Sequence, residues 1–296
     1  MIYADSHVEF IHHPDDLAEL PDPGMSLRQI NPDLIDAVQP ELLFLACWVE
    51  AGDSAWDKLQ WVLAEYQRVI AERGWRLVKS RADLDQPGVK ILLHVEDLAA
   101  IGDDLGRIDW LHEQGIRSIG LTHNHRNQFA GGSLALQDGL SDLGRQAIAL
   151  MQERGILLDY AHLSPQAFRD VWARFKLRPF VSHTGIKAAY DQPRNLSAEL
   201  LEIVRDGDGY VGVGFAGSFL AKAGATIDQA LEHLTAALAI VGPDHVGIGS
   251  DFGGIISYLP TGLESIADIP QNLAPRLPDP AMGGANLLRL VHQLWS

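Results

Sequence analysis

The segment GILLDYAHLSPQAFRDVWARF, residues 155–175, contains the alternation that decides the fold. Its first part is a near-continuous apolar run, which is typical of a parallel-sheet strand that is covered on both faces. Ser164 then offers an N-cap oxygen, Pro165 suits the first helical position, and a helical pattern follows. The segment therefore predicts a strand over 157–162 that ends in His162, followed by a helix over 166–175.

The same strand-then-helix unit recurs along the chain, which is the pattern of a parallel sheet built from βα units. The sequence predicts eight strands, at 2–7, 42–48, 89–96, 118–123, 157–162, 180–183, 210–214 and 246–251. It predicts helices at 55–72, 108–113, 143–153, 166–175, 198–205, 227–240 and 285–294. Eight such units in 296 residues predict an α/β protein with a (β/α)8 TIM-barrel fold.

Two proline-rich stretches, 12–31 and 256–280, show little periodicity and do not fit a minimal barrel. Long segments without regular structure commonly cover the active-site end of a barrel. We therefore expect one barrel domain over 1–296, with these two loops above its active-site end.

Composition and charge exclude several classes of protein. The chain is 47% hydrophobic and 21% charged, as expected for a globular protein with a large core. Its net charge of −16 leaves no basic surface for phosphates, so we expect no nucleic-acid partner. No run approaches the ~18 apolar residues of a membrane span and no signal-peptide pattern is present, so we expect a cytoplasmic protein without membrane contact. Cys47, the only cysteine, lies in an apolar run and is expected to be a small buried side chain.

Side chains that can bind metals or transfer protons stand at the ends of six predicted strands. They are His7 with Glu9, Glu96, His123, His162, His183 and Asp251. Because the carboxyl ends of all strands in a parallel barrel share one rim, where barrel enzymes place their sites, we expect these side chains to lie together.

The spacing of these residues suggests how a metal would be held. His7 and Glu9 are two residues apart on a strand, so their side chains leave on the same face and can hold one ion. His162 and His183 lie on adjacent strands and can hold a second ion, and Glu96 can bridge because a carboxylate has two oxygens. Histidine with carboxylate ligands suits zinc or a similar divalent ion.

Each of these residues alone also has a structural interpretation. A single strand-terminal histidine is more often a hydrogen-bonded core or rim residue than a ligand, and Asp251 could merely cap a turn. The occurrence of all these residues together at the ends of six strands favours a metal or catalytic site. Seven other histidines are expected on the surface, in loops or on helices: 12, 13, 112, 125, 233, 245 and 292. His94, two residues before Glu96 on the same strand face, is expected to point inward and support a ligand.

Nine short motifs, in order, carry a resemblance to a known family. They are Asp5-Ser-His-Val-Glu9, Val95-Glu96-Asp97, Gly120-Leu-Thr-His-Asn124, Gly139-Leu-Ser-Asp-Leu-Gly144, Leu158-Asp-Tyr-Ala-His-Leu-Ser164, Val181-Ser-His-Thr184, Pro193-Arg-Asn-Leu196, Gly247-Ile-Gly-Ser-Asp-Phe252 and Gly284-Ala-Asn-Leu-Leu-Arg289. In this order they resemble the membrane (renal-type) dipeptidases, a group of zinc-dependent barrel hydrolases also found in bacteria without a membrane anchor. The resemblance covers almost the whole chain.

The resemblance implies a metal-dependent hydrolase barrel with two divalent metal ions, taken as zinc. Residues that match the family's ligands are His7 and Glu9 for one ion, His162 and His183 for the other, and Glu96 as the bridge. It also implies a dipeptide substrate cleaved by a metal-activated bridging water, and relatives suggest a homodimer.

Three further positions match residues that act on the substrate. The resemblance implies that His123 and Arg194 contact it, His123 at the oxyanion and Arg194 at the terminal carboxylate. It implies that Asp251 takes a proton from the water and delivers it to the leaving amine.

Several positions depart from the family pattern. The family normally has aspartate in place of Glu9 and commonly another aspartate in place of Gly253, and Gly214 and Ala216 are smaller than usual. These departures leave two alternatives beside a dipeptidase. One is a binuclear-metal amidohydrolase acting on another small amide, lactone or peptide-like metabolite. The other is a non-catalytic barrel that binds a ligand or partner after losing a metal ligand.

Overall fold

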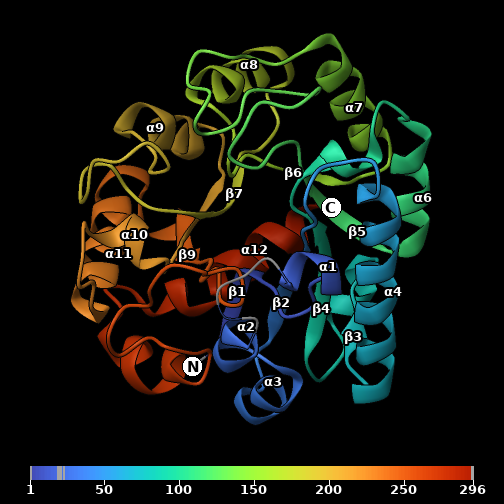
Figure 1. The fold of residues 1–296 in the computed structure, drawn as a ribbon. Coiled ribbons are helices and arrows are strands. Elements are labelled where there is room, and N and C mark those ends of the chain that lie inside the picture. The colour runs from blue at the N-terminus through green and yellow to red at the C-terminus, as the bar shows by residue number, and fades with distance from the viewer. Residues whose placement is uncertain (1, 19–21, 23, 295–296) are drawn as a thin grey trace.

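In the computed structural model, eight parallel strands form a nearly closed barrel that helices surround (Figure 1). The structure describes residues 2–18, 22 and 24–294. The barrel strands, in order around the sheet, are β1 (Ala4–Val8), β2 (Leu42–Cys47), β4 (Lys90–Val95), β5 (Ile116–Gly120), β6 (Leu157–Asp159), β7 (Phe180–Thr184), β8 (Tyr210–Val213) and β9 (Val246–Ile248). A two-residue strand, β3 (Arg76–Leu77), pairs with β4 outside this order. The predicted (β/α)8 barrel is confirmed.

The barrel closes just beyond the end of β9. The backbone N–H of Asp251 donates to the carbonyl of His7 at 2.9 Å, and that of Glu9 donates to the carbonyl of Phe252 at 2.9 Å. These two bonds join the first strand segment to the last. They also place three predicted site residues within one short stretch of the rim.

The seven predicted helices are present, with bounds within two residues of those predicted. They are α4 (Ala55–Arg73), α6 (Gly106–Gln114), α7 (Asp142–Glu153), α8 (Pro165–Phe175), α9 (Ala198–Asp206), α11 (Ile227–Val241) and α12 (Ala285–Leu294). Five short helices were not predicted: α1 (Pro14–Leu17), α2 (Met25–Gln29), α3 (Pro32–Val38), α5 (Arg81–Leu84) and α10 (Gly217–Leu220). They are too short to show an apolar period.

The two proline-rich stretches contain short helical segments in addition to loop. Residues 19–21 and 23 of the 12–31 stretch lie outside the described residues, and its described part includes α1 and α2. The 256–280 stretch contains a π-helical turn, Ile269–Leu273, and a 3₁₀ turn, Ala274–Arg276. None of the helices in the described part of the chain is long and apolar enough to cross a membrane.

Three of the strands end three residues earlier than the sequence predicted. β5 ends at Gly120, β6 at Asp159 and β9 at Ile248, so His123, His162 and Asp251 lie in the loops that follow. His162 and Asp251 adopt left-handed backbone conformations, with φ of 61° and 66°. A positive φ is incompatible with an extended strand, and non-glycine residues with this conformation concentrate at functional sites.

Inside the barrel, a layer of apolar side chains lies next to a layer that contains buried polar side chains. Its lower layer is apolar, with Phe44, Leu92, Leu157 and Phe180 packed against α12, which covers this end. Residues two positions further along point the same way. On β4, β6 and β7 these are His94, Asp159 and Ser182, and all three are buried. The apolar layer thus forms a rigid base beneath a polar layer, on which the rim histidines stand.

Candidate metal centre

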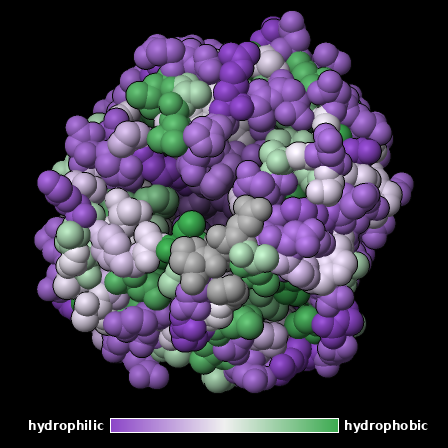
Figure 2. All heavy atoms as spheres, in the orientation of Figure 1, coloured by the Kyte–Doolittle hydropathy of each residue, from purple (hydrophilic) through white to green (hydrophobic). Residues whose placement is uncertain are grey.

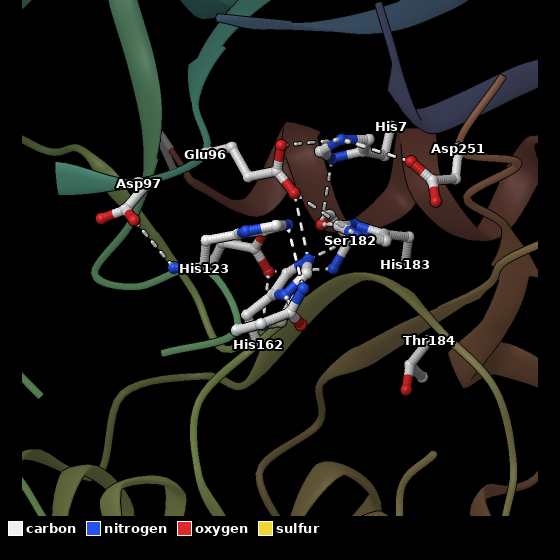
Figure 3. A network of polar contacts seen from close by, with 12 residues as sticks. His7, Glu96, Asp97, His123, His162, Ser182, His183, Thr184 and Asp251 are labelled. Carbon is white, nitrogen blue, oxygen red and sulfur yellow. Dashed lines mark hydrogen bonds and ion pairs between the residues drawn. The ribbon is translucent and has the colours of Figure 1, made fainter. Parts of the chain in front are cut away.

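Glu96, which follows β4, lies among three histidines from other strands (Figure 3). Its Oε1 atom is 3.0 Å from Nε2 of His162 and 3.6 Å from Nε2 of His183. Its Oε2 atom is 3.7 Å from Nε2 of His7. One carboxylate therefore reaches His7 with one oxygen and both His162 and His183 with the other, the arrangement expected of a bridging group.

The imidazoles of His162 and His183 face each other with their Nε2 atoms 2.9 Å apart. Nδ1 of His162 is 3.0 Å from Oδ1 of Asn124, and an amide oxygen only accepts hydrogen bonds. That oxygen also accepts the hydroxyl of Ser133 at 2.9 Å, which supports the orientation of the amide. His162 therefore carries its proton on Nδ1 and presents an Nε2 lone pair, which is the form that binds a metal.

Buried polar atoms without partners support a cation at this place. His7 Nε2 and Glu9 Oε2 are both buried and have no hydrogen-bond partner in the part of the chain that the structure describes. Such atoms are uncommon in proteins, because a buried polar group without a partner is costly, and a bound cation would satisfy both. Both are also ligand types that divalent metals bind, so the residues fit the expected metal.

The charge states of the cluster agree with this fit. Burial lowers the pKa of His7, His162 and His183 well below the usual value, so these imidazoles are neutral and free to donate lone pairs. Burial, reinforced by the charge of Glu9, raises the pKa of Glu96 and Asp251. A bound cation would favour the ionised carboxylates and would offset their desolvation.

Glu9 lines the cavity. Among the described residues, the carboxylate oxygens within 4.0 Å of His7 Nε2 belong to Glu96 and Asp251, the latter at 3.9 Å. The described residues contain three potential ligand clusters, and Glu9 belongs to none of them: His7, His183 and Asp251; Glu96, His123 and His162; and His7, His94 and Asp159. That Glu9 and His7 hold one ion stays a prediction. Burial raises the pKa of Glu9 to about 8.

The glycine that follows Phe252 is required by the local backbone. Gly253 has a φ of 96°, and a Cβ on it would lie 1.4 Å from the carbonyl oxygen of Glu9. The aspartate that the family commonly has here would therefore clash with the Glu9 backbone. The glycine at this position is therefore explained by the close approach of its backbone to the Glu9 carbonyl, just after β1.

A cavity of about 270 Å³ opens above the centre. The face of the barrel that carries it is hollowed near its middle (Figure 2). Its lining comprises Glu9, His12, Trp48, Glu96, His123, Asn124, His162, His183, Ala216, Ser218, Phe219, Asp251 and residues 253–257. The predicted site residues other than His7 and Arg194 line this one cavity. Both predicted loop stretches contribute to its wall, 12–31 through His12 and 256–280 through Ile256 and Ser257.

His123 stands beside the proposed ligands on the cavity wall. Its ring centroid lies 4.5 Å from that of His162 and 5.6 Å from that of Trp48, and its backbone N–H donates to Asp97 at 3.1 Å. Burial, with the nearby charge of Arg194 adding to it, lowers the pKa of His123 to about 4. The ring is therefore neutral near pH 7 and carries one N–H that can donate to a substrate oxygen.

Arg194 does not line this cavity but a neighbouring one of about 220 Å³, which His162 also borders. Its guanidinium donates to the carbonyl of His183 at 3.0 Å and lies over the ring of Phe219, 5.1 Å from the centroid. Its Nε atom is buried and has no hydrogen-bond partner among the described residues. Burial lowers the pKa of Arg194 to about 10, and the charges of Asp251 and Glu96 oppose this shift.

Several residues of the site were not predicted. Asn124 and Ser182 contact the proposed ligand histidines, and Trp48 and His12 line the cavity. His12 lies in a loop, as expected, but its place on the cavity wall was not foreseen. Asn124 and Ser182 each adjoin a histidine in the sequence, which was the available signal.

Comparison with known proteins decides the family. A family model described as membrane dipeptidase (Peptidase family M19) matches residues 29–293. The chain belongs to this membrane dipeptidase family. The resemblance carried by the nine motifs is thereby confirmed. The match extends from the end of α2 into α12 and contains eight of the nine motifs; β1 and the first motif, Asp5–Glu9, precede it.

Individual relatives are 30 to 33% identical to this chain. An uncharacterised dipeptidase of Schizosaccharomyces pombe is 33% identical over 190 residues, which are 62% of this chain and 45% of that protein. An uncharacterised Klebsiella pneumoniae protein from the pqqA 5′ region is 30% identical over 234 residues, 73% of this chain and 85% of that protein. The chain spans about half the length of the first curated relatives it matches.

Solved structures share the fold at low sequence identity. A metallopeptidase from Rhodobacter sphaeroides, liganded with a phosphinate mimic of the dipeptide L-Ala-D-Ala, superposes with a TM-score of 0.85 at 22% identity. The alignment covers 100% of this chain and 99% of that one. A probable dipeptidase from Pseudomonas aeruginosa superposes with a TM-score of 0.84 at 18% identity, covering 100% of this chain and 96% of that one. These likenesses confirm the barrel.

Proposed function

We propose that this protein is a metal-dependent dipeptidase that hydrolyses the peptide bond of small dipeptides. The observation that carries the proposal is the pair of Nε2 atoms of His162 and His183, 2.9 Å apart and facing Glu96 in the wall of one cavity. Membership of the membrane dipeptidase family supports it, as does the dipeptide mimic bound by the similar Rhodobacter sphaeroides structure.

Two divalent ions, taken as zinc, would be held by this chain's own residues. His162 and His183 would hold one, His7 and Glu9 the other, and Glu96 would contact both. The free Oε2 atom of Glu9 and the free Nε2 atom of His7 support these assignments. When bound, such ions lower the pKa of a coordinated water toward neutrality and polarise the scissile carbonyl.

Asp251 is the proposed proton carrier. It lines the cavity, and its left-handed backbone turns its carboxylate back toward the histidines, 3.9 Å from Nε2 of His7. As the water oxygen bonds to the carbonyl carbon, Asp251 accepts a water proton. It returns that proton to the amide nitrogen as the C–N bond breaks, which leaves a free carboxylate and a free amine.

His123 and Arg194 are proposed to bind two polar groups of the substrate, the oxygen of the scissile carbonyl and the terminal carboxylate. The neutral His123 ring can donate its N–H to the oxygen that becomes negative during attack. Arg194 is retained as the partner of the dipeptide carboxylate because its Nε is free and its guanidinium lies over Phe219, a cavity residue. In this proposal residues 12–31 and 256–280 cover the cavity mouth and limit it to small substrates.

The decisive experiment is a substrate panel on metal-depleted and zinc-reconstituted protein. We expect free amino acids to be released from dipeptides with L- or D-residues at the C-terminal position, only after zinc is restored. His183→Ala is the matched inactive variant, because it removes one facing imidazole. Two bound zinc ions without turnover of any dipeptide would instead favour another small amide or lactone as substrate. Near-zero zinc after reconstitution would favour a non-catalytic barrel.

A further inference from the structure

Ser182, on β7, lies between two of the proposed metal ligands (Figure 3). Its Oγ atom is 2.9 Å from Nδ1 of His183 and 3.4 Å from Nδ1 of His7. The three side chains are buried, with exposed fractions of 0 or 1%. His7 belongs to β1 and His183 to β7, so one hydroxyl contacts imidazoles from opposite parts of the sequence.

The Ser182 hydroxyl can determine which nitrogen of each imidazole carries the proton, and so which nitrogen is left with a lone pair for a metal. A hydroxyl oxygen has two lone pairs and can accept an N–H from both Nδ1 atoms. Each ring then presents an Nε2 lone pair toward Glu96, at 3.6 Å for His183 and 3.7 Å for His7. If Ser182 donated to either ring, that ring would carry its proton on Nε2 and could not bind a metal there.

The backbone of Ser182 is held on both sides. Its N–H donates to Oδ1 of Asp159 at 2.9 Å. Its carbonyl accepts the hydroxyl of Ser6 at 2.5 Å, and Ser6 also donates to the carbonyl of Ile248 at 3.0 Å. These bonds tie β7 to β1, β6 and β9 and fix the backbone from which Oγ reaches the two rings.

We propose that Ser182 is a positioning residue that sets the tautomer of both His7 and His183, and so prepares one ligand of each metal ion. His162 has a separate partner, Asn124, and contributes to one ion only. The proposal rests on the metal centre of the proposed function and not on the identity of the substrate.

The test compares zinc affinity in the full chain by competition with a chelator. Ser182→Ala should weaken binding of both zinc ions by roughly 10- to 100-fold, the usual effect of removing a group that orients a metal-binding histidine. Asn124→Ala should weaken only the ion held by His162 and His183. Ser141→Ala is the control, because it removes a hydroxyl that caps α7, bonds the backbone of Gln128 and Gly144, and does not line the cavity.

A second readout reports the tautomers directly. In ¹⁵N NMR of the imidazoles, His7 and His183 of the unsubstituted protein should show a protonated Nδ1, and Ser182→Ala should show a shift toward a protonated Nε2. A general loss of stability would not move these signals in that direction. If Ser182→Ala does not fold, Ser182→Cys keeps the volume with a weaker acceptor and should show the same changes in smaller degree.

Zinc affinity in both Ser182 variants equal to that of Ser141→Ala would overturn the proposal, as would unchanged tautomers. Failure of the dipeptidase assignment gives a different result. In that case no dipeptide is cleaved by the unsubstituted protein, yet zinc affinity still falls in Ser182→Ala.

Discussion

Gly254 lies directly against the carboxylate of Glu9. A Cβ placed on Gly254 would stand 2.7 Å from Oε1 of Glu9 and 2.8 Å from Oδ1 of Asp251. The longer side chain of Glu9 thus occupies space that a side chain at residue 254 would fill. Where the family normally has aspartate at position 9, this chain combines glutamate with a glycine across the site.

The contact between Gly254 and Glu9 predicts that substitutions at these two positions offset each other in their effect on metal binding. Gly254→Ala should displace the Glu9 carboxylate and reduce bound zinc from two ions per chain toward one, measured by elemental analysis after dialysis. The double variant Glu9→Asp with Gly254→Ala should regain the second ion, because the shorter acid leaves room for the methyl group. Gly106→Ala, on the outer helix α6, is the control. Two tightly bound ions in Gly254→Ala would show that the contact is unimportant.

Asp251→Asn should reduce kcat by roughly 10²- to 10⁴-fold, the range expected when a general acid–base group is lost. Bound zinc should stay unchanged, because the proposal gives Asp251 a proton and not an ion to hold. Steady-state kinetics with parallel metal analysis make this comparison, with the exposed Asp244→Asn as the control. If zinc is lost along with activity, Asp251 is a ligand and the assignment of its role is wrong.

Arg194→Met should raise KM for dipeptides by roughly 10- to 100-fold, as expected for a lost hydrogen bond to a charged group. The informative comparison uses dipeptide amides, which lack the terminal carboxylate. The unsubstituted protein should prefer the free acid, and the variant should lose most of that preference. An unchanged preference would mean that another group binds the carboxylate.

Glu9 should make the stability of the zinc-free protein depend on pH. Burial raises its pKa from the ordinary 4.5 to about 8, so the unfolded chain releases this proton first as pH rises. Between these values the native state binds more protons than the unfolded state, and stability falls as pH increases. Glu9→Gln should therefore be more stable than the unsubstituted zinc-free protein at pH 8, and this advantage should vanish near pH 4.5.

Denaturant unfolding at several pH values measures this difference. The buried histidines act in the opposite sense, since their lowered pKa values reduce stability as pH falls below 6.5. They are common to both proteins and cancel in the comparison. Zinc should remove most of the difference above pH 6.5 by favouring the ionised carboxylate. A difference in the free energy of unfolding between the zinc-free unsubstituted protein and Glu9→Gln that does not change with pH would contradict this prediction.

The order of strands and helices was predictable because it is encoded in local periodicity. The apolar run near Leu157 and the helix that starts at Pro165 were visible within a few residues of sequence. The topology of a parallel barrel then places all strand ends on one rim, so His162 and His183 could be expected to meet. Their Nε2 atoms do lie 2.9 Å apart.

The geometry within the rim was not predictable in the same way. The 3.4 Å contact of Ser182 with His7 joins residues 175 positions apart, and the contact of Gly254 with Glu9 depends on how the chain crosses β1 after β9. The left-handed turn at Asp251 likewise follows from its bond to the His7 carbonyl. No local pattern carries these contacts.

The sequence by itself therefore determined the barrel and the family, because each depends on neighbouring residues or on short motifs. Only the tertiary structure decided that Glu96 and Asp251 bring carboxylate oxygens within 4.0 Å of His7 Nε2, that Arg194 lines a neighbouring cavity, and that Ser182 contacts the imidazoles of His7 and His183. The physical reason is that side chains from distant strands take their separations from the closure and packing of the whole barrel, to which every strand contributes.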